Sequence, residues 1–168
     1  MNLPPVNASL SDSRYCCFLV GADCFAVASG GVAEVLRDEK ITRVPHAPDA
    51  VIGLVHLRGR IVPVVDMRRR LGMPAADCSR SHTHLVIRLH DDWYSLLVDE
   101  MLEVIEVADS DIHPPARATT ESAHDAITGV YADTGRLVHF LDPQRIVHAL
   151  ARQREPFLQR QGAPHGSL

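Results

Sequence analysis

An internal repeat constrains the fold of this chain more than any other feature. Residues 23–45 match residues 92–114 at a constant offset of 69 positions. Residues 53–66 then match residues 129–142 at an offset of 76. Both stretches begin with a glycine, continue with five residues that differ, and end in the string G-R-(I/L)-V-x-x-(V/L)-D. Self-similarity over blocks of this length marks a duplicated structural unit. We therefore expect the chain to be built from two copies of one unit.

The repeat divides the chain into two units, at about residues 14–72 and 83–150, joined by a polar linker at residues 73–82. Each unit holds about five short runs of β-favouring residues, with turn signals about every 8 to 12 residues, which favours small barrels over a parallel sheet. We predict a mainly β fold of two small five-stranded β-barrel subdomains with short helices. Residues 1–13 are expected to form a flexible arm, and residues 151–168 a polar tail.

Local patterns predict individual elements within the units. Two hairpins are expected over residues 15–28 and 51–65, because β-favouring runs flank glycine-containing turns. Residues 31–36 space their apolar side chains as in one or two turns of helix. Residues 41–44 form a short strand candidate that ends at a proline. Near the C-terminus, an aspartate N-cap followed by proline predicts a terminal helix over residues 143–150.

Comparison of the two copies separates architecture from function. Residues that recur in both units are best explained by the shared fold, whereas a polar residue present in one unit is a better candidate for function. Gly53 and Gly59 recur, so we interpret them as residues of turns or of close backbone approach. Asp66 also recurs, at a strand end where its carboxylate can cap backbone N–H groups.

Arg58 differs between the copies, because the second unit has Thr134 at the equivalent position. It precedes the hairpin glycine, so its guanidinium should stand on an exposed turn. A guanidinium offers five donors in a planar fork that suits bidentate capture of a carboxylate. Two interpretations remain open: Arg58 braces Glu34 within the chain, or it contacts a partner.

Several classes of function are disfavoured by composition. The net charge of −4 lacks the basic excess that nucleic-acid binding requires. No apolar run approaches the roughly 18 residues that span a bilayer, and no secretory signal is readable at the N-terminus. We therefore expect a cytoplasmic protein that neither binds nucleic acid nor inserts into a membrane.

Catalytic and metal-binding patterns are weak. The tightest ligand cluster is Cys78, His82 and His84, but no further ligand follows at a suitable spacing. Residues 91–111 carry eight acidic side chains and no basic one, which is typical of a solvated or partner-facing surface. The four cysteines are interpreted as reduced thiols, mostly in the core. We expect no cofactor and no enzyme, with a metal-dependent enzyme using Cys78, His82 and His84 as the remote alternative.

One stretch of the first unit carries a family resemblance. Residues 51–68 read VIGLVHLRGRIVPVVDMR, which resembles the signature of the CheW-like coupling proteins of bacterial chemosensory systems, roughly G-V-I-N-L-R-G-x-I-V-P-V-(I/V)-D-L-R. His56 replaces the usual Asn and Met67 the usual Leu. Supporting segments extend the resemblance over about 135 of the 168 residues. It implies two packed five-stranded barrels and a non-catalytic adaptor.

The resemblance also implies partners. Such adaptors bridge the cytoplasmic tip of methyl-accepting chemoreceptors and the regulatory domain of a CheA-type histidine kinase, in membrane-associated receptor arrays. We expect the receptor tip to lie in the apolar groove between the barrels. The same fold in a pathway controlling surface attachment, pili or a second messenger remains an alternative. Positions that match receptor or kinase contacts are Val32, Glu34, Gly53 and Arg58, and those that match the kinase-facing barrel edge are Ile41, Thr42 and Ile61.

Overall fold

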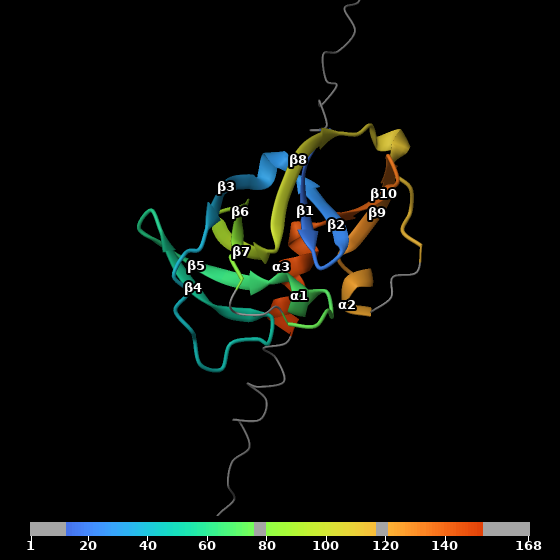
Figure 1. The fold of residues 1–168 in the computed structure, drawn as a ribbon. Helices are drawn as coiled ribbons and strands as arrows, with labels where there is room; N and C mark the ends of the chain where they lie inside the picture. The colour runs from blue at the N-terminus through green and yellow to red at the C-terminus, as the bar shows by residue number, and fades with distance from the viewer. Residues whose placement is uncertain (1–12, 76–79, 117–120, 153–168) are drawn as a thin grey trace, which may run out of the picture.

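The computed structural model of the chain describes residues 13–75, 80–116 and 121–152. The described residues form a mainly β fold with two five-stranded sheets and three α-helices (Figure 1). The predicted fold class is therefore confirmed. The helices are α1 (Met67–Arg70), α2 (Glu121–His124) and α3 (Pro143–Arg152). Single 3-10 turns are η1 (Ser29–Gly31) and η2 (Asp109–Asp111).

The two sheets have the same strand pattern. Sheet 1 runs β8-β1-β2-β10-β9, and sheet 2 runs β3-β6-β7-β5-β4. The strands of sheet 1 are β1 (Arg14–Val20), β2 (Asp23–Ala28), β8 (Glu100–Glu106), β9 (Ile127–Asp133) and β10 (Arg136–Leu141). The strands of sheet 2 are β3 (Val32–Arg37), β4 (Val51–Leu57), β5 (Arg60–Asp66), β6 (Thr83–Leu89) and β7 (Asp92–Val98). Each strand of sheet 1 thus has its sequence-repeat counterpart at the same place in sheet 2.

The sheets do not coincide with the two halves of the chain. The hairpin β1–β2 joins three strands of the second half, and β6–β7 joins three strands of the first half. The expectation that each half of the chain forms its own barrel is wrong, because each sheet contains a hairpin from the other half. The two parallel pairs, β2 with β10 and β5 with β7, join the halves. A repeat cannot specify this choice, because two similar hairpins offer similar pairing edges to the same three strands.

The hairpin turns follow the predicted chemistry. Gly59 has φ +76° and Gly135 has φ +85°, and the residues before them, Arg58 and Thr134, also have positive φ. Two successive residues with positive φ form the tight turn whose twist matches antiparallel strands. The interpretation of these glycines as turn residues is confirmed, and Arg58 is held on the turn by the same geometry.

Gly53 and Gly129 lie where another segment of the chain approaches the backbone too closely for a Cβ atom. A Cβ on Gly53 would lie 2.4 Å from the carbonyl oxygen of Thr42, and a Cβ on Gly129 would lie 2.4 Å from Cγ2 of Ile112. Thr42 forms an isolated bridge to Leu54, with both N···O distances at 2.8 Å. In each unit, the segment after the third strand therefore crosses directly over the glycine of the fourth.

Two local predictions need correction. Residues 31–36 do not form a helical turn: η1 ends at Gly31, and β3 follows with half-buried and exposed residues in strict alternation. The apolar spacing fitted either structure, and pairing of the β-branched residues with β6 decided for a strand. Residues 41–44 contribute only the single bridge at Thr42. The hairpins β1–β2 and β4–β5 and the helix α3 agree with the predictions.

The buried apolar residues form three clusters. The largest contains residues of both sheets and of α3, including Phe18, Leu85, Leu96 and Ile146. One smaller cluster belongs to the strands of sheet 1 and another to sheet 2. The shared cluster indicates that the two sheets stabilise each other by packing, as expected for units near the lower size limit for independent folding.

A buried arginine joins α1 to α3. The Arg70 side chain donates from Nε to the carbonyl oxygen of Ile146 at 3.1 Å and from Nη2 to that of Arg145 at 3.3 Å. Arg70 is only 5% exposed, and burial lowers the pKa of its guanidinium. The burial of Arg70 was not predictable from the sequence, because three successive arginines give no sign of which one points inward.

We expect Arg70→Met to lower the free energy of unfolding by about 2 kcal/mol, because two carbonyl groups lose a charged donor in a buried place. Chemical denaturation followed by circular dichroism measures this. Arg69→Met is the matched control, since Arg69 is the neighbouring half-exposed arginine and should cost less than about 1 kcal/mol. Equal losses in the two variants would contradict the assigned role of Arg70.

Candidate partner-binding surface

Arg58 and Glu34 form a bidentate ion pair across sheet 2. Nε of Arg58 donates to Oε1 of Glu34 at 3.3 Å, and Nη2 donates to Oε2 at 3.2 Å. The pair joins the β4–β5 turn to β3, so it links the two ends of a curled sheet. The Arg58 side chain is 76% exposed and that of Glu34 16%. Glu34 therefore holds the guanidinium in a fixed orientation, while the remaining N–H donors face outward.

The other candidate residues are distributed over sheet 2 and the segment that crosses β4. Val32 is half-buried at the start of β3, and Gly53 is buried beneath Thr42. Thr42 is exposed, and Ile41 is half-buried against the position of Gly53. Ile61, on β5, is 62% exposed. The structure thus brings six of the seven residues to the surface in whole or part, whereas Gly53 acts through the segment that crosses it.

The second unit carries an equivalent ion pair that the sequence analysis missed. Arg136 on β10 donates to Glu103 on β8, and it also lies 3.2 Å from Asp133. The hydrogen bond from Arg136 lowers the pKa of Glu103. Glu103 matches Glu34 in the repeat, and this was the available signal. Arg136, however, matches Arg60, which instead stacks on the ring of Trp93 at 5.0 Å from its centroid.

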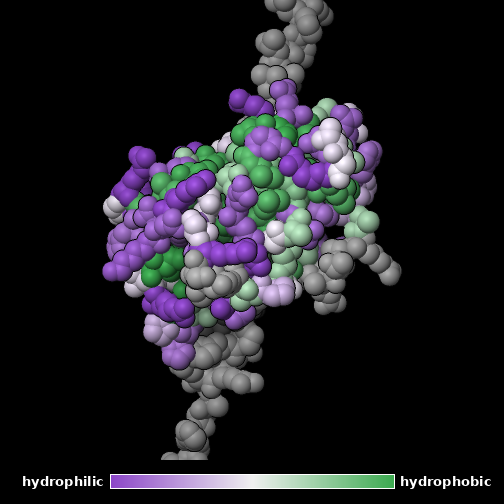
Figure 2. Space-filling model, in the orientation of Figure 1, coloured by the Kyte–Doolittle hydropathy of each residue, from purple (hydrophilic) through white to green (hydrophobic). Residues whose placement is uncertain are grey.

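Exposed aliphatic residues lie near both ion pairs in sequence. Val35 directly follows Glu34 in β3, so its side chain points to the opposite face of that strand. Next to the Glu–Arg pairs, the same repeat positions are exposed in each unit: Val35 (44%) and Ile61 (62%) in the first, Val104 (57%) and Leu137 (49%) in the second. On the face drawn in Figure 2, hydrophobic side chains reach the surface over the β8 and β1 region among hydrophilic ones. Arginine is enriched among the residues that dominate binding energy at protein interfaces, whereas Val and Leu are under-represented there, so the arginines are the stronger candidates for partner contact.

A second arginine pair fixes the units relative to each other. Arg68, in the family-like motif, donates to Asp99 from Nε at 3.0 Å and from Nη2 at 2.7 Å. Asp99 also accepts the backbone N–H of Gly21, in the β1–β2 turn, at 2.6 Å. Burial alone would raise the pKa of Asp99, but these hydrogen bonds outweigh it and the pKa is lowered. Asp99 therefore remains charged and bridges a turn of sheet 1 to α1.

The histidines of the metal alternative do not form a site in the described residues. His84 is buried, with Nδ1 at 2.8 Å from Oγ of Ser95, and burial lowers its pKa. His82 precedes β6 and is half-buried, and Cys78 lies outside the described residues. Within the ranges that the structure describes, no group of three or more His, Cys, Asp or Glu residues could hold a metal ion.

The described cysteines are core residues. Burial is the main cause that raises the pKa of Cys17 to about 12, and Cys16 and Cys24 are buried as well. At pH 8 only about one Cys17 thiol in 10,000 would be ionised, and the thiolate is the nucleophile that attacks iodoacetamide. These thiols are therefore unsuited to nucleophilic chemistry.

We expect the tryptic peptide 15–37, which carries all three of these cysteines, to stay unalkylated when the folded protein meets iodoacetamide at pH 8. The same peptide should be fully alkylated in guanidinium chloride, because unfolding removes the burial. Mass spectrometry of the two digests measures the difference. Similar labelling rates in both states would mean that the thiols are accessible in the folded chain.

The architecture defines a class of protein. Two equivalent five-stranded sheets each present a Glu–Arg pair and exposed aliphatic residues at the surface, which gives the chain a duplicated surface for partner contact. No helix in the described ranges has the length and apolar character to cross a membrane.

Comparisons with known proteins identify the family. The model of the CheW-like domain matches residues 14–151. The chemotaxis protein CheW of Rhizobium meliloti (strain 1021) is 35% identical over 121 residues, which cover 72% of this chain and 78% of that protein. Protein PilI of Pseudomonas aeruginosa is 31% identical over 84 residues, covering 50% of this chain and 47% of that protein. The crystal structure of the scaffolding protein TtCheW from Thermoanaerobacter tengcongensis matches with a TM-score of 0.71 at 24% identity, covering 78% of this chain and 89% of that one.

The chain belongs to the CheW-like family. It is a chemotaxis coupling adaptor and not an enzyme. The resemblance drawn from residues 51–68 is thereby confirmed.

Proposed function

We propose that this adaptor couples the cytoplasmic tips of chemoreceptors to the regulatory domain of a CheA-type histidine kinase, in the cytoplasm at membrane-associated arrays. The observation that carries the proposal is the duplicated surface. An adaptor must hold two partners at once, and the chain presents a Glu–Arg pair with exposed aliphatic neighbours on each of its two units.

The first unit carries the contact positions that the family resemblance indicates. Arg58 offers outward-facing donors to a carboxylate, and Val32 and Glu34 lie on the same edge strand β3. The edge formed by Ile41, Thr42 and Ile61 is proposed to face the kinase. The receptor tip is proposed to lie between the units, where an amphipathic helix can bury its apolar side.

Reconstitution tests the proposal. The full chain is mixed with a receptor cytoplasmic fragment attached to vesicles and with the kinase, and the vesicles are sedimented. We expect the kinase to sediment only when receptor and adaptor are both present. Kinase that stays in the supernatant with the complete mixture would overturn the assignment of these two partners.

The partial match to PilI favours a second candidate output, in which the same adaptor serves a pathway controlling surface attachment or pili. Co-purification from the native host, followed by mass-spectrometric identification of the receptor and kinase, separates the outputs. A receptor encoded beside flagellar genes supports chemotaxis, whereas one encoded beside pilus genes supports the second candidate.

A further inference from the structure

A cavity of about 490 Å³ lies at one end of sheet 2. One wall is the segment 41–49, which links β3 to β4 and includes the bridge at Thr42. The rest of the lining comes from the start of β4 and from Asp66, Arg69, Ala75, His82 and Leu97. The volume is within the range of small-molecule sites, and the mouth of a small β-barrel is a common place for one.

The floor of this cavity is apolar. Ile41, Ile52 and Leu97 line it, and all three belong to or pack against the core cluster of sheet 2. Val51 lies beside them. A ligand with a hydrocarbon part would therefore extend the hydrophobic core of sheet 2 and remove apolar surface from water.

The rim of the cavity carries two arginines and two aspartates. Arg69 is 3.5 Å from Asp66 and 3.6 Å from Asp49, so one arginine contacts both carboxylates. Oδ1 of Asp66 also accepts the N–H groups at the start of α1. Arg43 is exposed on the rim and makes no hydrogen bond or ion pair among the described residues. The unpaired guanidinium donors of Arg43 therefore favour an anion at this rim.

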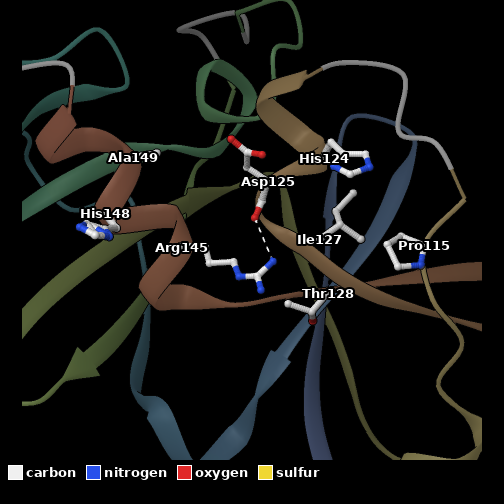
Figure 3. Close-up of a pocket in the computed structure, with 8 residues that line it drawn as sticks. All are labelled: Pro115, His124, Asp125, Ile127, Thr128, Arg145, His148 and Ala149. Carbon is white, nitrogen blue, oxygen red and sulfur yellow. Dashed lines mark hydrogen bonds between the residues drawn. The ribbon is translucent and has the colours of Figure 1, made fainter.

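An equivalent cavity in the second unit provides an internal comparison (Figure 3). There Arg145 donates to the backbone oxygen of Asp125 at 3.5 Å, as Arg69 donates to that of Asp49 at 3.3 Å. The arginine frame is thus part of the repeated architecture. The floor differs, because Thr128 stands where the first unit has Ile52.

We propose that the cavity of the first unit binds a small carboxylate with a short apolar chain, the carboxylate meeting Arg43 and the chain lying on Ile41, Ile52 and Leu97. The inference concerns binding alone and does not depend on the partners proposed above. The ligand is either a free organic acid or the C-terminus of a peptide, and both offer a carboxylate next to an apolar chain.

Titration of the full, isotope-labelled chain with hexanoate tests the proposal, read by backbone amide shifts in two-dimensional NMR. We expect saturable shifts confined to residues 41–52, 69 and 97, with a dissociation constant of about 1 mM, a scale suited to a ligand of this size. Hexanamide keeps the chain without the charge, and acetate keeps the charge without the chain. Both should bind at least about fivefold more weakly than hexanoate. A pentapeptide with a C-terminal leucine, compared with its amide, shows whether the peptide source also binds.

Variants place the site. Arg43→Gln and Ile52→Thr should each weaken hexanoate at least about fivefold, the first by removing the cation and the second by copying the floor of the other unit. Arg145→Gln, in the equivalent cavity of the second unit, is the distant control and should leave binding unchanged. The proposal is overturned if the shifts do not saturate, if hexanamide or acetate binds as well as hexanoate, or if Arg145→Gln weakens binding as much as Arg43→Gln.

Discussion

Arg58→Glu is expected to reduce retention of the receptor fragment and of the kinase at least about tenfold in pull-down with the purified chain. The substitution places a second carboxylate against Glu34 and reverses the charge that a partner meets on the β4–β5 turn. The fold should survive, because ion pairs between exposed side chains contribute only about 0 to 1 kcal/mol. Thermal unfolding of the variant measures that control directly.

The double variant Glu34→Arg with Arg58→Glu separates the two roles left open for Arg58. It restores an ion pair between the turn and β3 but presents the opposite charge outward. Since Arg58 is 76% exposed and keeps unused donors, we expect the double variant to remain defective. Recovery of binding would show that Arg58 acts as an internal brace. Wild-type retention of both partners by Arg58→Glu alone would remove Arg58 from the interface.

The sequence predicted the parts of the fold that local chemistry determines. The turns at Gly59 and Gly135 need positive φ, and the hairpins around them follow from that requirement. The caps at Asp66 and Asp142 were also predictable, because a strand-ending aspartate accepts the first N–H groups of the next helix. These features depend on neighbours in sequence, which a pattern can show.

The exchange of hairpins between the halves was not predictable in the same way. Its determinant is the parallel pairing of β2 with β10 and of β5 with β7, which joins residues far apart in the chain. A repeat makes this harder, because each hairpin carries the pattern that the other half requires. Residues 31–36 were wrongly expected to be helical because their apolar spacing fits a helix, while the pairing of β3 with β6 is a long-range contact.

The sequence indicated the candidate residues of the first unit, Arg58 and Glu34, but not the Arg136–Glu103 pair of the second unit. Arg58 was singled out because the second unit has Thr134 at that position. Glu34 was expected at a partner contact from the family resemblance, whereas Glu103 was not expected there, although both pair with an arginine at the surface. The two units achieve this with arginines from different positions, Arg58 from a turn and Arg136 from a strand. A residue-by-residue comparison of the copies cannot detect an equivalence of that kind.

Gly53→Ala is expected to lower the free energy of unfolding by about 3 kcal/mol, the largest stability effect of the variants considered. The new Cβ would lie 2.4 Å from the carbonyl oxygen of Thr42 and 2.6 Å from Cγ2 of Ile41. The oxygen cannot withdraw without cost, because it accepts the N–H of Leu54 while the N–H of Thr42 donates back. Relief of the clash therefore breaks both bonds and lifts Ile41 from the core cluster of sheet 2.

Gly31→Ala is the matched control, because a Cβ there meets its nearest atom at 3.9 Å and its backbone is not in the left-handed region. Its free energy of unfolding should stay within about 0.5 kcal/mol of the parent chain or rise slightly, since alanine has less backbone freedom to lose. Urea denaturation compares the three proteins, and equal midpoints for Gly53→Ala and the parent would show that the crossing segment yields easily.

Partner binding is then measured at a temperature where Gly53→Ala remains folded. A binding defect under those conditions places residues 41–42 at the interface, because the substitution adds no surface group and acts only by moving the segment above it.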